Sequence, residues 1–188
     1  MLRESFAVFG DLQMLVYGAA AMPKQGLRLW LSEQGKSNNV WLIGGTIPCQ
    51  QGVRDITNVR SACFLYDSKG VEVARYDKIH MFDVDIKDSH GSYRESDTFE
   101  AGDKLVIVDT PIGKVGLTIC YDLRFAEMHA KLVDLGAQVI VNGAAFTKTT
   151  GQAHWHTLLR ARAIETQCYL LAALMVGDTI IDKPLVTQ

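Results

Sequence analysis

Residues 115–173 read VGLTICYDLRFAEMHAKLVDLGAQVIVNGAAFTKTTGQAHWHTLLRARAIETQCYLLAA, and this stretch determines the predicted fold class. Its apolar runs predict buried strands at residues 115–119, 139–141 and 169–173. Its two segments of helical spacing predict helices, one from residue 125 to 135 and one from 154 to 166. Gly136 follows the first segment, as expected of the residue just after a helix. This alternation of strand and helix favours an α/β layered fold.

The sequence before this stretch adds more strands and one long loop. Apolar runs predict strands at residues 40–47, 61–66, 71–76 and 105–109. The second and third of these flank a turn-rich segment that ends at Gly70, so they predict a β-hairpin in which Gly70 has a positive φ. Residues 78–104 have no sustained periodicity and predict a long loop, a kind of segment that is often functional in compact domains.

Composition limits the class of protein. With 188 residues, of which 48% are hydrophobic and 21% charged, the chain is expected to form one globular domain. A formal net charge of -2 gives no general attraction to nucleic acid or to an anionic membrane. No apolar run approaches the ~20 residues that span a bilayer, and the N-terminus lacks the pattern of a signal peptide. The four cysteines are widely spread without a C-x-x-C pair, so a reduced, cytoplasmic protein is expected.

Cys120 is the first candidate for chemistry. It lies where an apolar strand is expected to end and a polar turn to begin, before a helix. In open α/β sheets ligands usually bind at this carboxyl end of a strand. Backbone N–H groups of the following turn can lower the pKa of a thiol and can bind an oxyanion. Position alone nevertheless favours a buried structural cysteine, which is a common fate of free cysteine.

Three charged residues are further candidates, although each is ordinary by itself. Lys78 directly follows a predicted strand, where its ammonium could stabilise negative charge on a carbonyl oxygen. Taken singly, it is more simply a solvated lysine of the long loop. Glu4 and Glu95 are equally ordinary, because most carboxylates lie on the surface.

Four stretches together resemble the nitrilase superfamily of carbon–nitrogen hydrolases: RYDKIHMFDVDI at 75–86, YRESDTFEAGD at 93–103, VGLTICYDLRFAEM at 115–128 and AHWHTLLRARAIETQCYLLAA at 153–173. Their order and separation are also similar to those of the family. The resemblance extends over residues 1–177. It implies an α-β-β-α sandwich that usually dimerises and that uses neither a metal ion nor an organic cofactor.

The same resemblance implies roles for particular residues. The family uses a Glu-Lys-Cys triad together with a second glutamate. Cys120 corresponds to the nucleophile, Lys78 to the lysine of the R-Y-x-K motif, and Glu95 to the second glutamate. Leu2-Arg-Glu-Ser-Phe6 is similar to the family's L-P-E-x-F, which makes Glu4 the general base.

The sequence departs from the family pattern at several places. Arg3 replaces the proline that usually precedes the first glutamate, and Ala126 stands where R-F-P-E would have a proline. Family members carry a strand and a helix before that glutamate, whereas this chain begins almost on it. Residues 178–188 do not resemble the family's continuation. The resemblance therefore implies a partial hydrolase domain at residues 1–177, truncated at both ends, followed by a divergent C-terminal tail.

Substrate class follows from a narrower resemblance. Residues 145–155 and the Tyr93-Arg-Glu-Ser96 loop are similar to the branch that deamidates small ω-amides, such as deaminated glutathione or α-keto acid amides. Such substrates carry carboxylates, which cations near a pocket select. The expected substrate-binding residues are Tyr121, Arg124, Arg94 and Lys148. The three cations could instead form surface or structural ion pairs.

Other interpretations stay open at this point. The chain could be a catalytically inactive truncated remnant, or a ligand-binding or interaction module on the same scaffold. A cysteine hydrolase with a Cys-His pair is a further alternative, for which His80, His129, His154 and His156 are available. The last two are separated by two positions, so they do not share a helix face as a metal-binding pair would. The main expectation is a homodimeric amidase that acts on a small-molecule amide and binds neither nucleic acid nor membrane.

Overall fold

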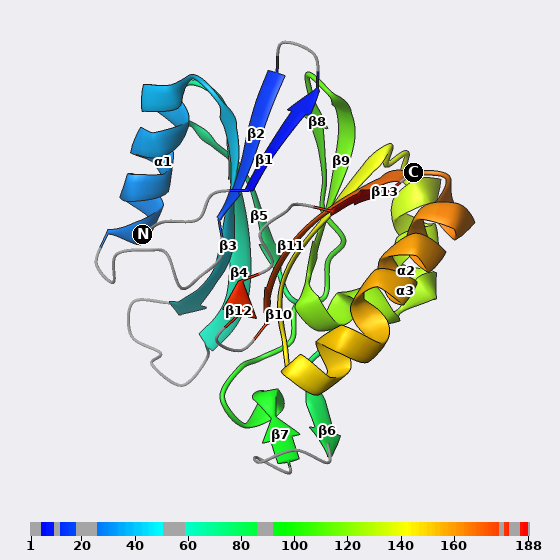
Figure 1. Cartoon of the computed structure of the whole chain (residues 1–188). Helices are drawn as coiled ribbons and strands as arrows, with labels where there is room; N and C mark the ends of the chain where they lie inside the picture. Colours follow the sequence, from blue (N-terminus) through cyan, green and yellow to red (C-terminus); the bar gives the residue numbers. More distant parts are fainter. Residues whose placement is uncertain are drawn as a thin grey trace.

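Two sheets pack face to face, with helices on both outer faces (Figure 1). The computed structural model describes residues 5–9, 12–17, 26–50, 59–85, 92–176, 179–180 and 185–187. Helix α1 (Leu27–Asn38) covers the first sheet, whereas α2 (Ala126–Asp134) and α3 (Lys148–Thr166) cover the second. The predicted α-β-β-α sandwich is therefore confirmed. No helix among these residues is long and apolar enough to cross a membrane.

The first sheet has the strand order β1-β2-β3-β4-β5. Its strands are β1 (Ser5–Phe9), β2 (Leu12–Tyr17), β3 (Trp41–Gln50), β4 (Val59–Tyr66) and β5 (Glu72–Asp77). β4 and β5 form the predicted antiparallel hairpin, and Gly70 in its turn has φ 79°. A Cβ at Gly70 would lie 2.4 Å from the carbonyl oxygen of Ser32 in α1, so the turn also needs glycine for close packing. The sequence pattern did not predict β1, β2 or α1.

The second sheet has the order β12-β11-β10-β9-β8, and β13 also pairs with β11. Its strands are β8 (Ile107–Thr110), β9 (Gly113–Ile119), β10 (Val139–Phe146), β11 (Tyr169–Val176), β12 (Thr179–Ile180) and β13 (Leu185–Thr187). β9, β10 and β11 are parallel and are connected through α2 and α3, as the α/β pattern predicted. β12 and β13 lie within residues 178–188, the segment expected to be a divergent tail, and both pair with β11. The predicted domain boundary at residue 177 stays a prediction.

Several elements are longer than their sequence patterns indicated, and β10 and α3 exceed the prediction most. β10 continues to Phe146 because the buried polar side chain of Asn142 has a partner within the sheet, donating to Thr118 Oγ1 at 2.9 Å. α3 begins at Lys148, six residues earlier than expected. The Thr147 hydroxyl caps this end by accepting a hydrogen bond from the Thr150 N–H at 3.2 Å. Such a cap stabilises a polar first turn that has no apolar periodicity.

The prediction of an uninterrupted loop at residues 78–104 is wrong in part. This segment contains a small antiparallel pair, β6 (Asp83–Asp85) and β7 (Ser92–Arg94), followed by the short helix η2 (Glu95–Asp97). The pair projects from one end of the sandwich (Figure 1). Strands of three residues with exposed ends are too short to produce an alternating apolar pattern. The rest of the segment has no regular structure among the described residues.

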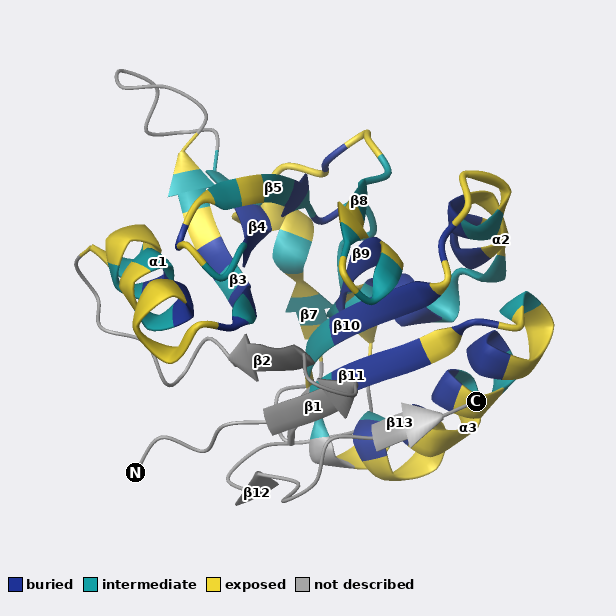
Figure 2. Ribbon diagram, turned by 90° about the horizontal axis from the view of Figure 1, so that it is seen from above, coloured by how far each residue is buried: buried dark blue, intermediate teal, exposed yellow. Residues whose placement is uncertain are grey.

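The core follows the layers. One cluster of buried side chains lies between the two sheets, where Ile43, Leu65 and Tyr76 of the first sheet meet Leu117 and Val141 of the second. A second cluster joins the second sheet to its helices, and a third joins α1 to the first sheet. Figure 2 shows β10 and β11 as the largely buried centre of the second sheet.

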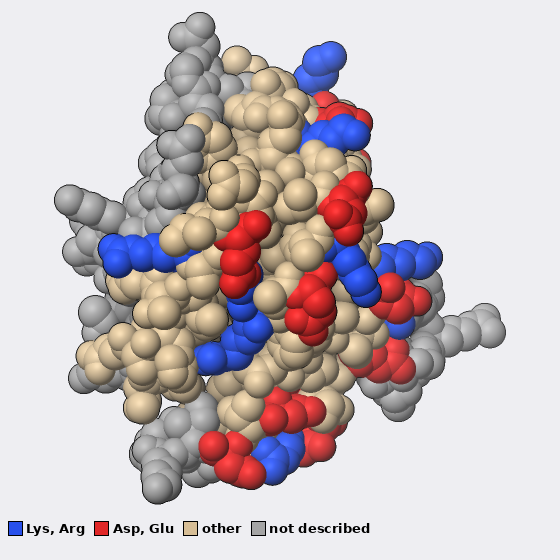
Figure 3. All heavy atoms as spheres, turned by 90° about the vertical axis from the view of Figure 1, so that its right-hand side faces the viewer, with Lys and Arg blue, Asp and Glu red and all other residues tan. Residues whose placement is uncertain are grey.

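On the face covered by α2 and α3, basic and acidic side chains are interspersed (Figure 3). For example, the exposed Lys131 of α2 and the exposed Glu165 of α3 lie on these two neighbouring helices. This face therefore carries no large patch of one charge sign among the residues that the structure describes.

A buried histidine in α2 makes stability depend on pH. His129 is fully buried, its Nδ1 lies 2.9 Å from the carbonyl oxygen of Phe125, and its Nε2 makes no hydrogen bond to a described residue. Burial lowers the pKa of His129 below its ordinary value. The unfolded chain therefore binds a proton near pH ~6.5 that the folded chain resists, so the free energy of unfolding falls as the pH drops below that value.

We expect His129→Leu to remove this part of the acid sensitivity. Urea midpoints at about pH 7.5 and pH 5.5 should differ less for the variant than for the unmodified chain. His156→Leu, which replaces an exposed histidine of α3, is the matched control and should leave the difference unchanged. An identical pH dependence in the His129 variant would contradict this account.

Candidate active site

A cavity of about 420 Å³ opens at the end of the sandwich where β9, β10 and the segment after β5 meet. Its walls come from both sheets and from the β6–β7 region. The lining residues are Gly45, Thr46, Lys78, Phe82, Tyr93, Arg94, Glu95, Ile119, Cys120, Tyr121, Arg124, Gly143, Ala144, Ala145, Phe146, Thr150 and Ala173. The carboxyl ends of β9 and β10 thus open onto a cavity, which is where ligands bind in α/β sheets.

Cys120 stands at a sharp turn on the cavity wall. β9 ends at Ile119, and Cys120 begins the short helix η3 (Cys120–Arg124) with φ 48°. An L-residue in this left-handed region costs of order 1–3 kcal/mol, and such strain is concentrated at functional sites. The thiol is partly buried and its Sγ donates to the carbonyl oxygen of Ala145 at 3.6 Å. The turn therefore presents the sulfur to the cavity.

The protonation of this thiol is set by two opposing effects. Burial raises the pKa of Cys120 above its ordinary value, and the positive charge of Lys78 lowers it by a smaller amount. The protonated thiol is therefore favoured in the resting site. A nucleophilic role would require a base that removes the proton as the sulfur attacks.

Lys78 is a buried cation with a carboxylate partner. It follows β5 and is 3% exposed, and its Nζ forms an ion pair with Glu95 Oε2. The same oxygen accepts a hydrogen bond from the Phe82 N–H at 2.7 Å. The main chain of Lys78 is also held, since its N–H donates to Ser61 O at 2.8 Å and its carbonyl accepts from Gly102 N at 2.7 Å. These contacts fix the ammonium at the cavity wall, where it can meet a developing negative charge.

Six of the eight residues singled out from the sequence line this one cavity. They are Lys78, Glu95, Cys120, Tyr121, Arg124 and Arg94. Glu4 lies outside the described residues. Lys148 is the first residue of α3, and its side chain lies outside the description too. The structure therefore brings these six together, while the role of each stays a prediction.

The two arginines of the cavity differ in their partners. Arg94 pairs with Asp85 through Nη2 and Oδ1 at 2.9 Å. Arg124 has no carboxylate partner among the described residues, and its guanidinium lies 5.6 Å from the ring centroid of Tyr121. Its Nη2 is 3.1 Å from Nδ1 of His154. Arg124 is consequently the cation whose charge is more available to an anionic ligand.

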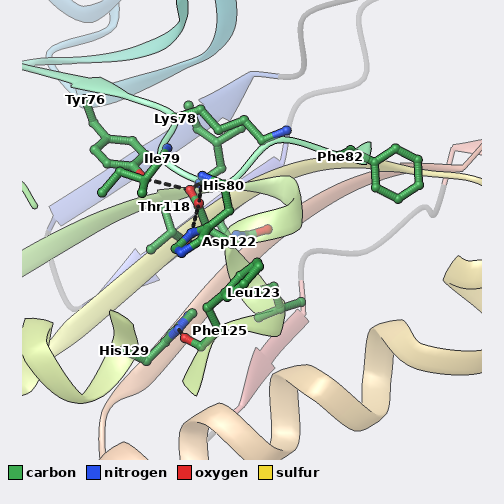
Figure 4. A network of polar contacts seen from close by, with 12 residues as sticks. Tyr76, Lys78, Ile79, His80, Phe82, Thr118, Asp122, Leu123, Phe125 and His129 are labelled. Carbon is green, nitrogen blue, oxygen red and sulfur yellow. Dashed lines mark hydrogen bonds and ion pairs between the residues drawn. The ribbon is translucent and has the colours of Figure 1, made fainter. Parts of the chain in front are cut away.

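A buried polar network beside the cavity was missed in the sequence. Asp122 is fully buried and accepts hydrogen bonds from the main chain of Ile119, from Tyr76 and from His80 (Figure 4). The His80 ring stacks on Phe125 with centroids 3.6 Å apart. Asp122 lies two residues after Cys120 in sequence, but nothing in the pattern indicated that a histidine 42 residues away would meet it.

The histidines do not supply a Cys-His pair in the described structure. His80 Nδ1 is 2.8 Å from Asp122, His129 Nδ1 faces Phe125 O, and His154 Nδ1 faces Arg124. The hydrogen bond of Cys120 Sγ goes to a carbonyl oxygen instead. Among the described residues, no group of three or more His, Cys, Asp or Glu is placed to hold a metal ion.

Comparison with known sequences assigns the chain to a protein family. The family model described as carbon-nitrogen hydrolase matches residues 16–186. A deaminated glutathione amidase of Yersinia enterocolitica is 52% identical over 178 residues, which cover 94% of this chain and 62% of that protein. The omega-amidase NIT2 of Homo sapiens is 38% identical over 168 residues, which cover 86% of this chain and 59% of that protein. The chain thus spans about three fifths of the length of these relatives.

Solved structures show the same fold. The crystal structure of the Caenorhabditis elegans NitFhit protein matches with a TM-score of 0.73 and 38% identity, over 86% of this chain and 39% of that chain. Saccharomyces cerevisiae Nit3, a member of branch 10 of the nitrilase superfamily, matches with a TM-score of 0.68 and 31% identity, over 81% of this chain and 52% of that chain. With its two-sheet fold and a family match over nearly its whole length, the chain belongs to the carbon–nitrogen hydrolase family of the nitrilase superfamily.

Proposed function

We propose that this protein hydrolyses a small linear amide to a carboxylate and ammonia through a thioester on Cys120. The observation that carries the proposal is the position of Cys120, a strained residue at the carboxyl end of β9 in the same cavity as the Lys78–Glu95 ion pair. A thiol beside a buried ammonium has the two parts that acyl transfer needs, a nucleophile and a group that stabilises the oxyanion. Membership of the carbon–nitrogen hydrolases supports the same reaction.

The reaction proceeds in two stages. The Cys120 sulfur attacks the amide carbonyl while a base removes the thiol proton, and Glu4 is the proposed base. Lys78 and the backbone N–H after Cys120 stabilise the oxyanion, and removing one such donor typically slows an enzyme by about 10²–10³-fold. The protonated base then gives its proton to the departing nitrogen, so that ammonia leaves and a thioester remains. Water activated by the same base cleaves the thioester and restores the thiol.

Glu95 has a supporting role in this scheme. Its Oε2 holds both the ammonium of Lys78 and the main-chain N–H of Phe82. Burial of a lysine without a charged partner is energetically costly, and the ion pair with Glu95 offsets that cost. We therefore assign Glu95 to the positioning of Lys78 and to its positive charge.

The proposed substrate is an ω-amide that carries a carboxylate at its other end. Two relatives are named deaminated glutathione amidase and omega-amidase, names that indicate amides of this kind. In this chain, Arg124 lines the cavity and forms no ion pair with a carboxylate among the described residues. Tyr121 and Phe146 lie against its guanidinium, with centroids 5.6 and 5.5 Å from Cζ, and hold it in place. A cavity of about 420 Å³ suits a small molecule.

Location and assembly complete the proposal. All four cysteines are free, which supports a reducing, cytoplasmic location. A homodimer is proposed from the family resemblance alone. The two alternatives, an inactive truncated remnant and a binding module, are disfavoured because the described part of the chain keeps Cys120, Lys78 and Glu95 together in one cavity.

Replacement of each cysteine tests which thiol reacts. We expect Cys120→Ala to abolish ammonia release from glutaramate-like amides, because no other thiol lines the cavity in the described structure. Cys63→Ala and Cys168→Ala, which remove buried thiols of the core, should keep most of the rate and serve as controls. Undiminished turnover in the Cys120 variant would exclude it as the nucleophile, and binding without turnover in the unmodified chain would favour the binding module.

Arg124 is tested by pairing it with a substrate that lacks the carboxylate. For the unmodified chain, kcat/KM for glutaramate should exceed kcat/KM for the neutral amide pentanamide. Arg124→Met should lower the value for glutaramate by about 10–100-fold, as expected from loss of a charge-assisted hydrogen bond, and should change pentanamide little. Arg160→Met, at an exposed position of α3 outside the cavity lining, is the control. An equal loss on both amides would assign Arg124 a structural role instead.

A further inference from the structure

The two central groups of the proposed site come from different sheets. Lys78 follows β5, the last strand of the first sheet, and Cys120 follows β9 of the second. Backbone hydrogen-bond ladders run within each sheet, so they do not determine how far Lys78 lies from Cys120. That separation depends on the apolar packing between the sheets and on any polar contact that joins the two segments directly.

Asp122 makes such a contact. Its Oδ2 accepts from the Ile119 N–H at 2.9 Å and from the Tyr76 hydroxyl at 2.7 Å. Its Oδ1 faces His80 twice, accepting from the main-chain N–H at 3.0 Å and lying 2.8 Å from Nδ1. One buried carboxylate therefore holds the residue before Cys120 on one side and two residues that flank Lys78 on the other (Figure 4).

The Tyr76 hydroxyl extends this contact along the chain. It donates to Asp122 and also accepts a hydrogen bond from the Ile79 N–H at 3.2 Å. Positions 76, 79 and 80 are thus fixed relative to Asp122, and Lys78 lies between them. The ion pair with Glu95 then determines only where the end of the Lys78 side chain points.

We propose that Asp122 is a positioning residue that holds the Lys78 segment against the Cys120 turn across the two sheets. The proposal rests on the proposed function, because positioning matters only if these two groups act on one substrate. A misplacement of about 1 Å between reacting groups can cost on the order of 10²-fold in rate. A contact that spans both sheets is the direct means of preventing such a shift.

The pattern of donors explains why a carboxylate occupies this position. Each oxygen of Asp122 receives a main-chain N–H, from Ile119 at one oxygen and from His80 at the other. Asparagine in either orientation would place its NH₂ group against one of these N–H donors, which cannot turn away. A buried carboxylate contributes little to stability compared with well-packed apolar residues. The geometry of the two main-chain N–H donors therefore explains why this position holds an aspartate.

The test compares two buried tyrosines, of which only Tyr76 contacts Asp122. Tyr76 and Tyr66 are both buried, on neighbouring strands, and each donates its hydroxyl to a carboxylate, Tyr66 to Glu72 at 3.1 Å. Tyr76→Phe breaks the contact with Asp122, whereas Tyr66→Phe is the matched control remote from the cavity. Asp122→Asn is the stronger variant, and Tyr76→Phe keeps the test decisive if Asp122→Asn does not fold.

Four quantities are measured for each variant: kcat and KM for a glutaramate-like amide, the midpoint of thermal unfolding, and the rate at which iodoacetamide alkylates Cys120. We expect Asp122→Asn to lower kcat by about 10²-fold and Tyr76→Phe by about 10-fold, with KM nearly unchanged. Tyr66→Phe should lower the unfolding midpoint about as much as Tyr76→Phe but leave kcat unchanged. Equal kcat for the two tyrosine variants would overturn the proposal.

Alkylation separates this proposal from the proposed function. The reaction joins Sγ to the acetamide carbon and releases iodide, and its rate follows the fraction of thiolate at Cys120, which Lys78 increases. If the unmodified chain hydrolyses no amide, the proposed function fails, yet alkylation still reports whether Lys78 keeps its place. Slower alkylation of Cys120 in Tyr76→Phe than in Tyr66→Phe supports the positioning role. Equal alkylation rates would overturn it, whatever the amidase activity.

Discussion

Contact between the two sheets is the constraint on which the site depends. Lys78 reaches the cavity from the first sheet and Cys120 from the second, and neither sheet alone contains both. The cluster that includes Leu65, Tyr76 and Leu117 fills the space between the sheets. Apolar packing of this kind is strong but not directional, so it fixes the distance between layers better than the alignment of particular groups. The buried hydrogen bonds of Asp122 are directional, so they align the Lys78 segment with the Cys120 turn.

Burial also determines the chemistry that the cavity can support. It raises the pKa of the Cys120 thiol, so the protonated thiol is favoured, and the proposed nucleophilic role requires a base. It also keeps Lys78 away from water. An ammonium interacts more strongly with a developing oxyanion in the protein interior than in water. Glu95 makes this possible by pairing with the lysine inside the protein. The positive φ of Cys120 places the sulfur at the cavity, where both effects operate.

Much of the fold could be predicted from local patterns. The β4–β5 hairpin follows from its turn residues and Gly70, and α2 from helical spacing that ends before Gly136. The extents of β10 and α3 could not be predicted, because Asn142 and the first turn of α3 look unlike a strand and a helix. The Asn142 amide nitrogen reaches its partner Thr118, and the first turn of α3 its Thr147 cap, only in the folded chain.

The site also contains residues that could be predicted and contacts that could not. Resemblance to a family singled out Lys78, Glu95 and Cys120, and the structure brings all three to one cavity. The partnership of Asp122 with His80 and Tyr76 could not be predicted, since it joins residues more than 40 positions apart through the meeting of two sheets.

If Cys120 carries an acyl group during amide hydrolysis, peptide mass mapping should detect it. The chain is incubated with a glutaramate-like amide, quenched in acid to preserve thioesters, digested and analysed. We expect a mass increase equal to the acyl group, confined to the peptide that contains Cys120 and removed by hydroxylamine. Ammonia release without any such adduct in the quenched samples, or an adduct on Cys49, Cys63 or Cys168 instead, would contradict this expectation.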